Sequence, residues 1–230
     1  MKIDILTMHP ALCEGPLESS IIGRAQREGH AIVTVHNLHE FGIGNYQQVD
    51  DSPYGGGAGM VLRVDVIFKA LDSLKNENSK VILLDPVGTP FKQQSAHDLS
   101  TFEHLIFICG HYEGVDARIR MHFVDYVFSI GDYVLTGGEL PALVIIDSIV
   151  RLLPGVLGNP ESILEESFQH GLLEAPVYTR PRDFNGHLVP DILTSGHHKN
   201  ISLWREEESK LLTQRARPDL WTHWLKSQSK

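Results

Sequence analysis

The spacing of apolar residues predicts strands that alternate with helices over the first two thirds of the chain. Residues 31–38 alternate as in a strand with two unlike faces, and short strands are predicted at 3–8 and 125–128 as well. Continuous apolar runs at 81–84 and 105–109 are typical of strands buried on both faces of a parallel sheet. Helical spacing predicts helices over the ranges 21–28, 63–74 and 139–153. This order is typical of an α/β fold.

Three loops that follow predicted strands are rich in glycine and polar residues, at 85–88, 110–114 and 129–139. In α/β sheets, loops at the carboxyl ends of the strands build the ligand site. None of the three carries the G-x-G-x-x-G or G-K-[ST] signature of a dinucleotide or triphosphate site. We therefore expect a pocket in which main-chain groups hold a small, flat, polar molecule. For any single loop, the alternative is an ordinary turn that needs glycine.

The composition excludes several classes of protein. The 230 residues are 42% hydrophobic and 21% charged, as in an ordinary globular chain. No run approaches the roughly 20 apolar residues of a membrane span. The first six residues include Asp4 and offer no cleavage site, so we expect a cytoplasmic protein rather than a secreted one. Cys13 and Cys109 form no C-x-x-C, which favours reduced thiols.

The formal net charge of −9 is unevenly distributed. Residues 1–170 carry 11 Lys and Arg against 22 Asp and Glu, whereas residues 171–230 carry 9 against 7. Pro154, Gly155 and following breaks in the chain precede this shift. We predict a first domain over 1–157, a linker over 158–170 and a second domain over 171–230; the alternative is a surface loop within a single domain.

Several blocks resemble the bacterial tRNA (guanine-N1)-methyltransferase family, TrmD. The most specific is SIGDYVLTGGELPA at 129–142. The others, in chain order, are DDSPYGGGAGM at 50–60, CGHYEGVD at 109–116, PGVLG at 154–158, GLL at 171–173, YTRP at 178–181, VP at 189–190, LTSGHH at 193–198 and WR at 204–205. The resemblance thus covers nearly the whole chain.

The resemblance implies a knotted, parallel-sheet α/β methyltransferase domain of the SPOUT class and a small, mainly helical C-terminal tRNA-binding domain. It implies an obligate homodimer with an active site across the subunit interface. The implied reaction transfers a methyl group from S-adenosylmethionine to N1 of guanosine 37 of tRNA, next to the anticodon, when position 36 is also guanosine. Magnesium is implied as well, without a dedicated ligand motif in this chain.

Methylation of guanine N1 needs a base for the N1 proton and a cation near O6, where negative charge develops. The resemblance assigns the base to Glu166, where the family usually has Asp, and the cation to Arg151. Glu165 is an adjacent alternative base. Without the resemblance, we would expect the two glutamates to be a solvated acidic pair. The residues alone favour an ion pair between Arg151 and Asp147, four positions earlier on the same predicted helix.

The resemblance also implies a set of cofactor contacts on the three loops. These are Leu83, Leu84, Pro86, Gly88, Gly110, Tyr112, Glu113, Ile130, Gly131, Asp132, Tyr133, Val134, Leu135, Gly137, Gly138 and Pro141. Ile130 and Leu135 suit an adenine ring, and Glu113 suits the ribose hydroxyls or the amino group. Core packing is the alternative for Tyr112 and Tyr133. His111 stands where the family commonly has Arg, and its role is open.

Contacts with tRNA are implied in two places. Tyr54, Gly55 and Gly56 lie on a glycine-rich loop, for which a simple surface loop is the alternative, and Arg180, His197 and Arg205 can meet phosphates near Arg182, His198 and Lys199. We expect no metal at His36 and His39 or at His197 and His198, because neither pair has a Cys or third ligand nearby. We expect the tryptophans at 204, 221 and 224 to pack helices, with stacking on bases as the alternative.

Two other functions are compatible with the sequence: a knotted methyltransferase that acts on another RNA or on a ribose 2′-oxygen, and a non-catalytic RNA- or nucleotide-binding dimer. The charge distribution adds one expectation for any of them. An acidic first part and a weakly basic second part predict a few local contacts with tRNA, and therefore a shallow dependence of affinity on salt.

Overall fold

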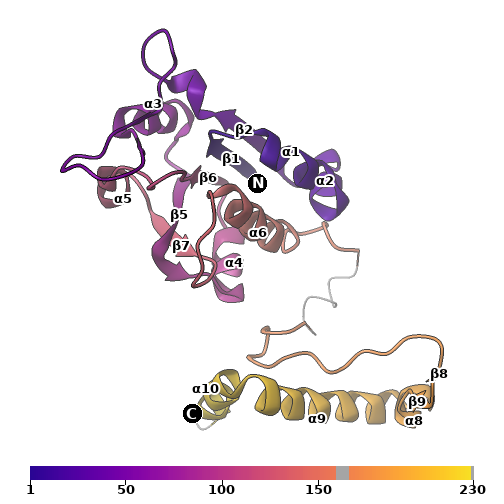
Figure 1. Ribbon diagram of the computed structural model, residues 1–230. Helices are drawn as coiled ribbons and strands as arrows, with labels where there is room; N and C mark the ends of the chain where they lie inside the picture. Colours follow the sequence, from indigo (N-terminus) through magenta and orange to yellow (C-terminus); the bar gives the residue numbers. More distant parts are fainter. Residues whose placement is uncertain (159–165, 229–230) are drawn as a thin grey trace. The chain divides into compact units, whose positions relative to one another are not determined.

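The computed structural model describes residues 1–158 and 166–228. These form two compact units, 1–158 and 159–230, so that residues 166–170 of the predicted linker belong to the second unit. Figure 1 shows the secondary structure of both units.

The first unit is built on a five-stranded sheet with the order β2-β1-β6-β5-β7, in which all neighbouring strands are parallel. The strands are β1 (Lys2–Thr7), β2 (Ile32–Asn37), β5 (Ser79–Pro90), β6 (His104–Cys109) and β7 (Tyr126–Ser129). A short antiparallel pair, β3 (Asp50–Asp51) and β4 (Val61–Leu62), lies outside this sheet. The predicted parallel α/β fold is confirmed, while the knot stays a prediction.

The helices of the first unit cover both faces of the sheet (Figure 1). They are α1 (Ala11–Glu18), α2 (Ser20–Arg27), the 3-10 helix η1 (Leu38–Phe41), α3 (Val64–Leu74), α4 (Gln93–Ser100), α5 (Ala117–His122) and α6 (Glu139–Val150). The helix expected over 139–153 is three residues shorter, because residues 151–153 form turns before Pro154. Helices α1, α4 and α5 and the 3-10 helix η1 were not predicted.

The core has two layers because side chains along the central strands alternate between the faces. Leu105 and Phe107 pack with residues of α1, α2, α4 and α6, whereas Ile106 and Ile108 pack with residues of α3 and α5. All four side chains are fully buried. The interpretation of the apolar runs as strands buried on both faces is therefore confirmed.

A polar network lies within the core of the sheet. The carboxylate of Asp4 accepts hydrogen bonds from Lys2 (2.8 Å), His36 (2.9 Å) and His104 (2.7 Å). Nδ1 of His104 lies 2.7 Å from the hydroxyl of Ser79. Burial opposes ionisation of Asp4, but these bonds outweigh it and lower the pKa of its carboxyl. The network thus joins β1, β2, β6 and β5 through one buried charge.

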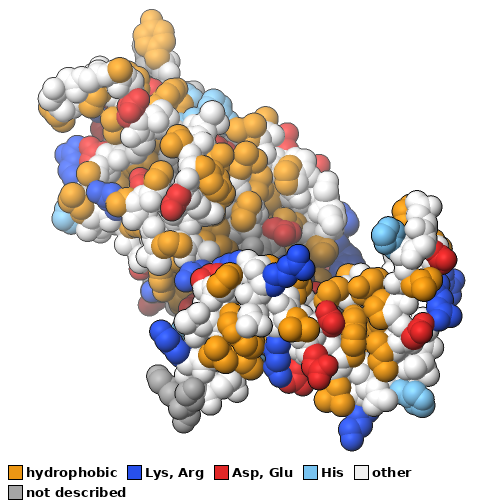
Figure 2. All heavy atoms as spheres, turned by 60° about the horizontal axis from the view of Figure 1, so that its bottom comes forward, with side chains coloured by type: hydrophobic (Ala, Val, Ile, Leu, Met, Phe, Trp, Pro, Cys, Tyr) orange, Lys and Arg blue, Asp and Glu red, His pale blue; other side chains and the backbone are white. Residues whose placement is uncertain are grey.

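The second unit is mainly helical. Its elements are β8 (Asp183–Phe184), β9 (His187–Leu188), α8 (Asp191–Thr194), α9 (His198–Ala216) and α10 (Pro218–Gln228). Trp221 and Trp224 stack with ring centroids 5.1 Å apart, and the Lys210 ammonium lies over Trp224. Apolar side chains are interspersed with charged ones on its visible surface (Figure 2). Across both units, no described helix is long and apolar enough to cross a membrane.

Candidate active site

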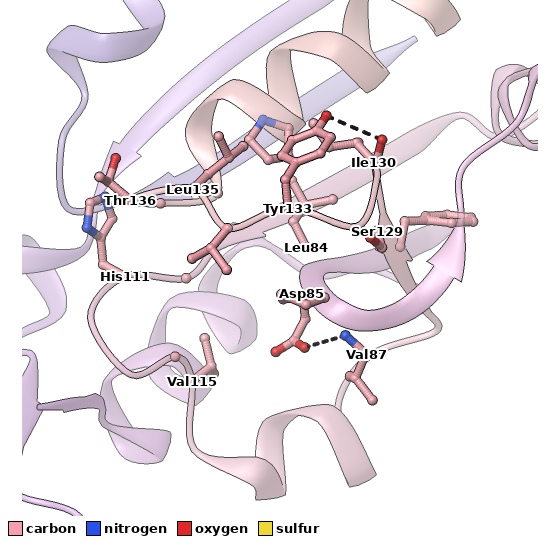
Figure 3. A pocket seen from close by; sticks show the side chains of 18 of the residues that line it. Leu84, Asp85, Val87, His111, Val115, Ser129, Ile130, Tyr133, Leu135 and Thr136 are labelled. Carbon is pink, nitrogen blue, oxygen red and sulfur yellow. Dashed lines mark hydrogen bonds between the residues drawn. The ribbon is translucent and has the colours of Figure 1, made fainter. Parts of the chain in front are cut away.

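An irregular stretch within β5, where its pairing with β7 shifts between Leu84 and Thr89, meets the loops that follow β6 and β7, and together they line a pocket of about 410 Å³ (Figure 3). The segments 84–87, 110–115 and 128–138 supply nearly all of the lining, and Pro141 of α6 completes it. The expected convergence of the segments 85–88, 110–114 and 129–139 is therefore confirmed, but the first of them lies within β5 and not in a loop after it.

Most of the expected cofactor contacts line this pocket. They are Leu84, Pro86, Gly110, Tyr112, Glu113, Ile130, Gly131, Tyr133, Val134, Leu135, Gly137, Gly138 and Pro141. Leu83, Gly88 and Asp132 are outside the lining. Leu83 instead joins the core layer that packs on α3, because neighbouring residues of a strand face opposite ways. Gly88 lies against the backbone of Phe128, and Asp132 is exposed.

Other lining residues belong to the three predicted loops but were not named as cofactor contacts, namely Asp85, Val87, Gly114, Ser129 and Thr136, while Val115 and Phe128 lie just outside the predicted loops. Asp85 has a sequence signal, since it is the first polar residue after the apolar run of β5. Its Oδ1 accepts a hydrogen bond from the Val87 N–H at 2.9 Å, which fixes the turn below the pocket (Figure 3).

Close backbone contacts join the second loop to the third. The Gly138 N–H donates to the carbonyl of Gly110 at 2.9 Å, and His111 forms an isolated β-bridge with Gly137. A Cβ atom on Gly138 would lie 2.7 Å from Cα of Cys109, a distance that a side chain does not tolerate. Glycine is therefore required here by the approach of two chain segments.

Glu139 forms a buried network beside the pocket. It is 1% exposed and is the first residue of α6, where the helix dipole favours a negative charge. Thr7 donates to its Oε1 at 2.5 Å, and Nε2 of His111 lies 3.1 Å from its Oε2. The ring of His9 contacts that of His111, with centroids 4.5 Å apart. His111, whose role was open, thus joins the second loop to α6 and β1.

The same carboxylate affects two buried thiols. Cys13 and Cys109 are free, as expected for reduced cysteines. Burial, with a smaller effect of the Glu139 charge, raises the pKa of Cys13 to about 11 and the pKa of Cys109 well above its usual value. Both thiols are therefore protonated at neutral pH.

Two tyrosines border the pocket and are open to solvent. Tyr112 is 54% exposed and Tyr133 is 56% exposed, so the core-packing alternative is wrong for both. The Tyr133 hydroxyl donates to the carbonyl of Ile130 at 3.4 Å, which turns its ring across the third loop (Figure 3). These rings are available to a bound molecule rather than to the core.

The loop expected to contact tRNA lies beside the pocket residue Glu113. The Glu113 N–H donates to the carbonyl of Met60 at 3.0 Å. A Cβ atom on Gly59, which has a φ of +86°, would lie 2.5 Å from Cγ of Glu113. Tyr54 is fully exposed at the start of the turn that contains Gly55 and Gly56. The main-chain hydrogen bond between Glu113 and Met60 thus joins this loop to the edge of the pocket.

Arg151 caps the C-terminal end of α6, where its N–H donates to the carbonyl of Asp147 at 3.3 Å. The pocket borders the other end of this 12-residue helix, at Gly138 and Pro141. At 1.5 Å per residue, the two ends are about 18 Å apart along the axis. The side chain of Arg151 does not span this distance to the pocket of its own chain. The expected Arg151–Asp147 ion pair stays a prediction.

The remaining expected site residues belong to the second unit. Glu166 is half-buried, and its carbonyl accepts from the N–H of Gln169 at 3.3 Å. The alternative base Glu165 lies outside the described residues. Arg180, His197 and Arg205 are exposed, and Arg182 forms an ion pair with Asp191 at 2.8 Å. Over 1–158 and 166–228, no three His, Cys, Asp or Glu side chains are grouped to hold a metal.

The fold and site define an α/β protein with a main-chain-rich pocket for a small molecule, joined to a helical unit that exposes several cationic side chains. The family model tRNA (Guanine-1)-methyltransferase TrmD matches residues 1–223. The chain therefore belongs to the tRNA (guanine-N1)-methyltransferase family.

Relatives that carry this name cover almost the same length. The chain is 54% identical over 220 residues to the tRNA (guanine-N(1)-)-methyltransferases of Dictyoglomus turgidum and Carboxydothermus hydrogenoformans. It is 52% identical over 221 residues to that of Staphylococcus aureus strain JH9. The alignments include 96% of this chain and 89%, 87% and 90% of the respective relatives.

Proposed function

We propose that this protein transfers a methyl group from S-adenosylmethionine to N1 of guanosine 37 of tRNA, next to the anticodon, when position 36 is also guanosine. Family membership supports the reaction class, and the pocket formed by three loops supports a bound cofactor. A tRNA substrate implies a reaction in the cytoplasm. In this proposal the first unit holds the cofactor and the second contributes contacts to tRNA.

The pocket suits a molecule the size of S-adenosylmethionine, which supplies a methyl group on positively charged sulfur. Its volume of about 410 Å³ lies within the range typical of small-molecule sites. Ile130 and Leu135 offer apolar surface for the adenine ring, and the glycine-rich segments offer main-chain donors and acceptors. Glu113 would bind the ribose hydroxyls or the amino group. These residues are the ones that we propose hold the cofactor.

Glu166 and Arg151 are the proposed catalytic residues. Guanine N1 carries a proton at neutral pH, and Glu166 accepts it as general base. The Arg151 guanidinium stabilises the negative charge on O6. Glu and Asp have similar ordinary pKa values, near 4.3 and 3.9, so glutamate suits the role despite its extra methylene. The described residues offer no grouped ligands for magnesium, and no step is assigned to it.

A homodimer is part of the proposal, and the position of Arg151 supports it. Since this side chain lies too far along α6 to reach its own pocket, a second copy of the chain would supply it. Leu12 of α1 and Leu140 and Val144 of α6 are 49–57% exposed, on two helices that contact each other. Exposed apolar side chains on helices that pack together fit an interface between two copies.

The replacement Glu166→Gln tests the proposal. Loss of a general base lowers turnover by about 10²–10⁴-fold. The measurement is the transfer of tritiated methyl groups to tRNA transcripts with guanosine or adenosine at position 36. The matched control is Glu174→Gln, an exposed residue of the same segment.

We expect Glu166→Gln to keep its affinity for S-adenosylmethionine and lose nearly all transfer, while the control retains its rate. Normal transfer by Glu166→Gln would remove Glu166 from the mechanism. Equal methylation of both transcripts would instead refute the role of guanosine 36.

A further inference from the structure

The segment that carries Glu166 is folded into a closed turn over residues 166–174. The Phe168 N–H donates to the carbonyl of Leu172 at 2.7 Å, and the Glu174 N–H donates to the hydroxyl of Ser167 at 3.0 Å. Phe168 has a φ of +77°, which reverses the chain inside the turn. Glu166 is thus the first residue of a defined local structure.

Two hydroxyl groups of α9 hold this turn by a single residue, Leu173. The Leu173 N–H donates to Oγ1 of Thr213 at 2.8 Å, and Oγ of Ser209 donates to the Leu173 carbonyl at 2.5 Å. The Thr213 hydroxyl also donates to the carbonyl of Ser209 at 2.7 Å. Both main-chain polar groups of Leu173 are therefore satisfied by side chains of one helix.

The hydrogen bonds of Ser209 and Thr213 to Leu173 form an anchor for the turn, and Thr213 is its buried part. Thr213 is 0% exposed and is the only buried residue within 166–228. The Leu173 N–H is partly buried, and leaving it without a partner is unfavourable, so a shift of the turn along α9 would cost its hydrogen bonds to Thr213 and Ser209. The anchor point is seven positions from Glu166, and the turn between them is closed by its own hydrogen bonds. Catalysis is sensitive to displacements near 1 Å, so a fixed turn matters for a general base.

We propose that Ser209 and Thr213 are positioning residues, which hold the turn so that the C-terminal unit carries the general base. This inference rests on the proposed role of Glu166. It assigns a second task to the unit proposed to bind tRNA, because α9 then fixes a reacting carboxylate as well. Neither hydroxyl contacts the substrate; both act through Leu173.

The test measures single-turnover methyl transfer with tRNA and S-adenosylmethionine both saturating, so that binding defects do not enter the rate. Thr213→Val removes the hydroxyl and keeps the shape, and Thr213→Ser restores the hydroxyl. Ser209→Ala removes the second contact from a half-buried position and carries the test if Thr213→Val fails to fold. The matched control is Thr222→Val on α10, where the Thr222 hydroxyl donates only to its own helix, to the carbonyl of Pro218.

We expect Thr213→Val and Ser209→Ala each to lower the transfer rate about ten-fold, as for a sub-ångström displacement of the base. Thr213→Ser and Thr222→Val should keep the normal rate, and the affinity for S-adenosylmethionine should be unchanged in all four. In the Glu166→Gln background, Thr213→Val should cause no further loss, because the group that it positions is already gone.

The outcomes separate the two proposals. If Glu166→Gln is inactive while Thr213→Val and Ser209→Ala transfer normally, the positioning role is wrong and the role of Glu166 stands. If Thr213→Val slows the Glu166→Gln variant by a further ten-fold, the hydroxyl acts elsewhere and the inference is overturned. If Glu166→Gln is fully active, both proposals fail together.

Discussion

Different interactions stabilise the interior of each of the two units. In residues 1–158, a parallel sheet buries an apolar layer on each face. In residues 166–228, no apolar side chain is buried, and the unit relies on stacked tryptophans and on hydroxyl groups that bond to the main chain. The first unit therefore has large apolar burial behind its pocket, whereas the second depends on a few polar contacts.

This difference has a functional consequence. A pocket whose walls are loops on a buried sheet is preorganised, and preorganisation lowers the cost of binding a small molecule. A helical unit with little apolar burial has low local stability and opens more readily. We expect its contacts with a large substrate such as tRNA to be adjustable, with the anchored turn at 166–174 as its most defined part.

The largest expected effect is on the core of the first unit. Phe107→Ala removes a fully buried ring from β6 and should lower the free energy of unfolding by about 3–5 kcal/mol. Leu211→Ala, in the second unit, removes a side chain that is 58% exposed and should cost less than about 1 kcal/mol. Urea unfolding followed by circular dichroism measures both, and equal losses would contradict the comparison.

A smaller effect is expected from the buried carboxylate of Asp4. Asp4→Asn should lower the free energy of unfolding by about 2–3 kcal/mol at neutral pH, because hydrogen bonds to a charged group are lost. The pKa of Asp4 is lowered in the folded protein. Its stabilisation is therefore present above the unfolded pKa, near 3.9, and disappears as the pH falls through the folded value.

The matched control for Asp4→Asn lies in the second unit. Asp219 bonds to Arg217, which lowers its pKa to about 2, but the pair is exposed and screened by solvent. We expect Asp219→Asn to leave the urea midpoint unchanged at neutral pH. If the difference between Asp4→Asn and the parent chain persisted undiminished at pH 2, the contribution of the charged network would be refuted.

The smallest of the three effects concerns the pocket. Glu139→Gln keeps the size of the side chain but removes the charge that accepts from Thr7 and lies beside His111. The affinity for S-adenosylmethionine should fall about ten-fold, which corresponds to about 1.4 kcal/mol. Glu206→Gln, which breaks an exposed pair with Lys210, should leave this affinity unchanged. Isothermal titration calorimetry measures both affinities. An unaltered affinity in Glu139→Gln would show that the hydrogen-bond network of Glu139 does not contribute to cofactor binding.

The sheet was predictable because strands buried on both faces leave continuous apolar runs in the sequence. Helix α1 was missed because it contains Gly15 and Pro16, which local propensity places outside helices. Helix α4 was missed because only Ala96 and Leu99 of its eight residues are buried, too few to show a period. In both cases packing against the rest of the unit overrides the local signal.

The candidate site was predictable where its residues are close in sequence. The three loops carry their signals within themselves, as glycine and polar residues directly after apolar runs. The contact between Thr7 and Glu139 joins residues 132 positions apart, and no spacing rule reveals such a pair. The same holds for Thr213, which is 40 positions from Leu173. Long-range hydrogen bonds of this kind are known only once the chain is folded.

The two protonated, buried thiols make this chain convenient for site-directed labelling. Alkylating reagents attack thiolates, so maleimide dyes should leave Cys13 and Cys109 unmodified in the native protein. A cysteine placed at Met121, which is 65% exposed in the first unit, or at Val177, which is 81% exposed in the second, would then react alone. A pair of dyes at these positions would report how the distance between the two units changes when tRNA binds. No native cysteine would have to be removed first.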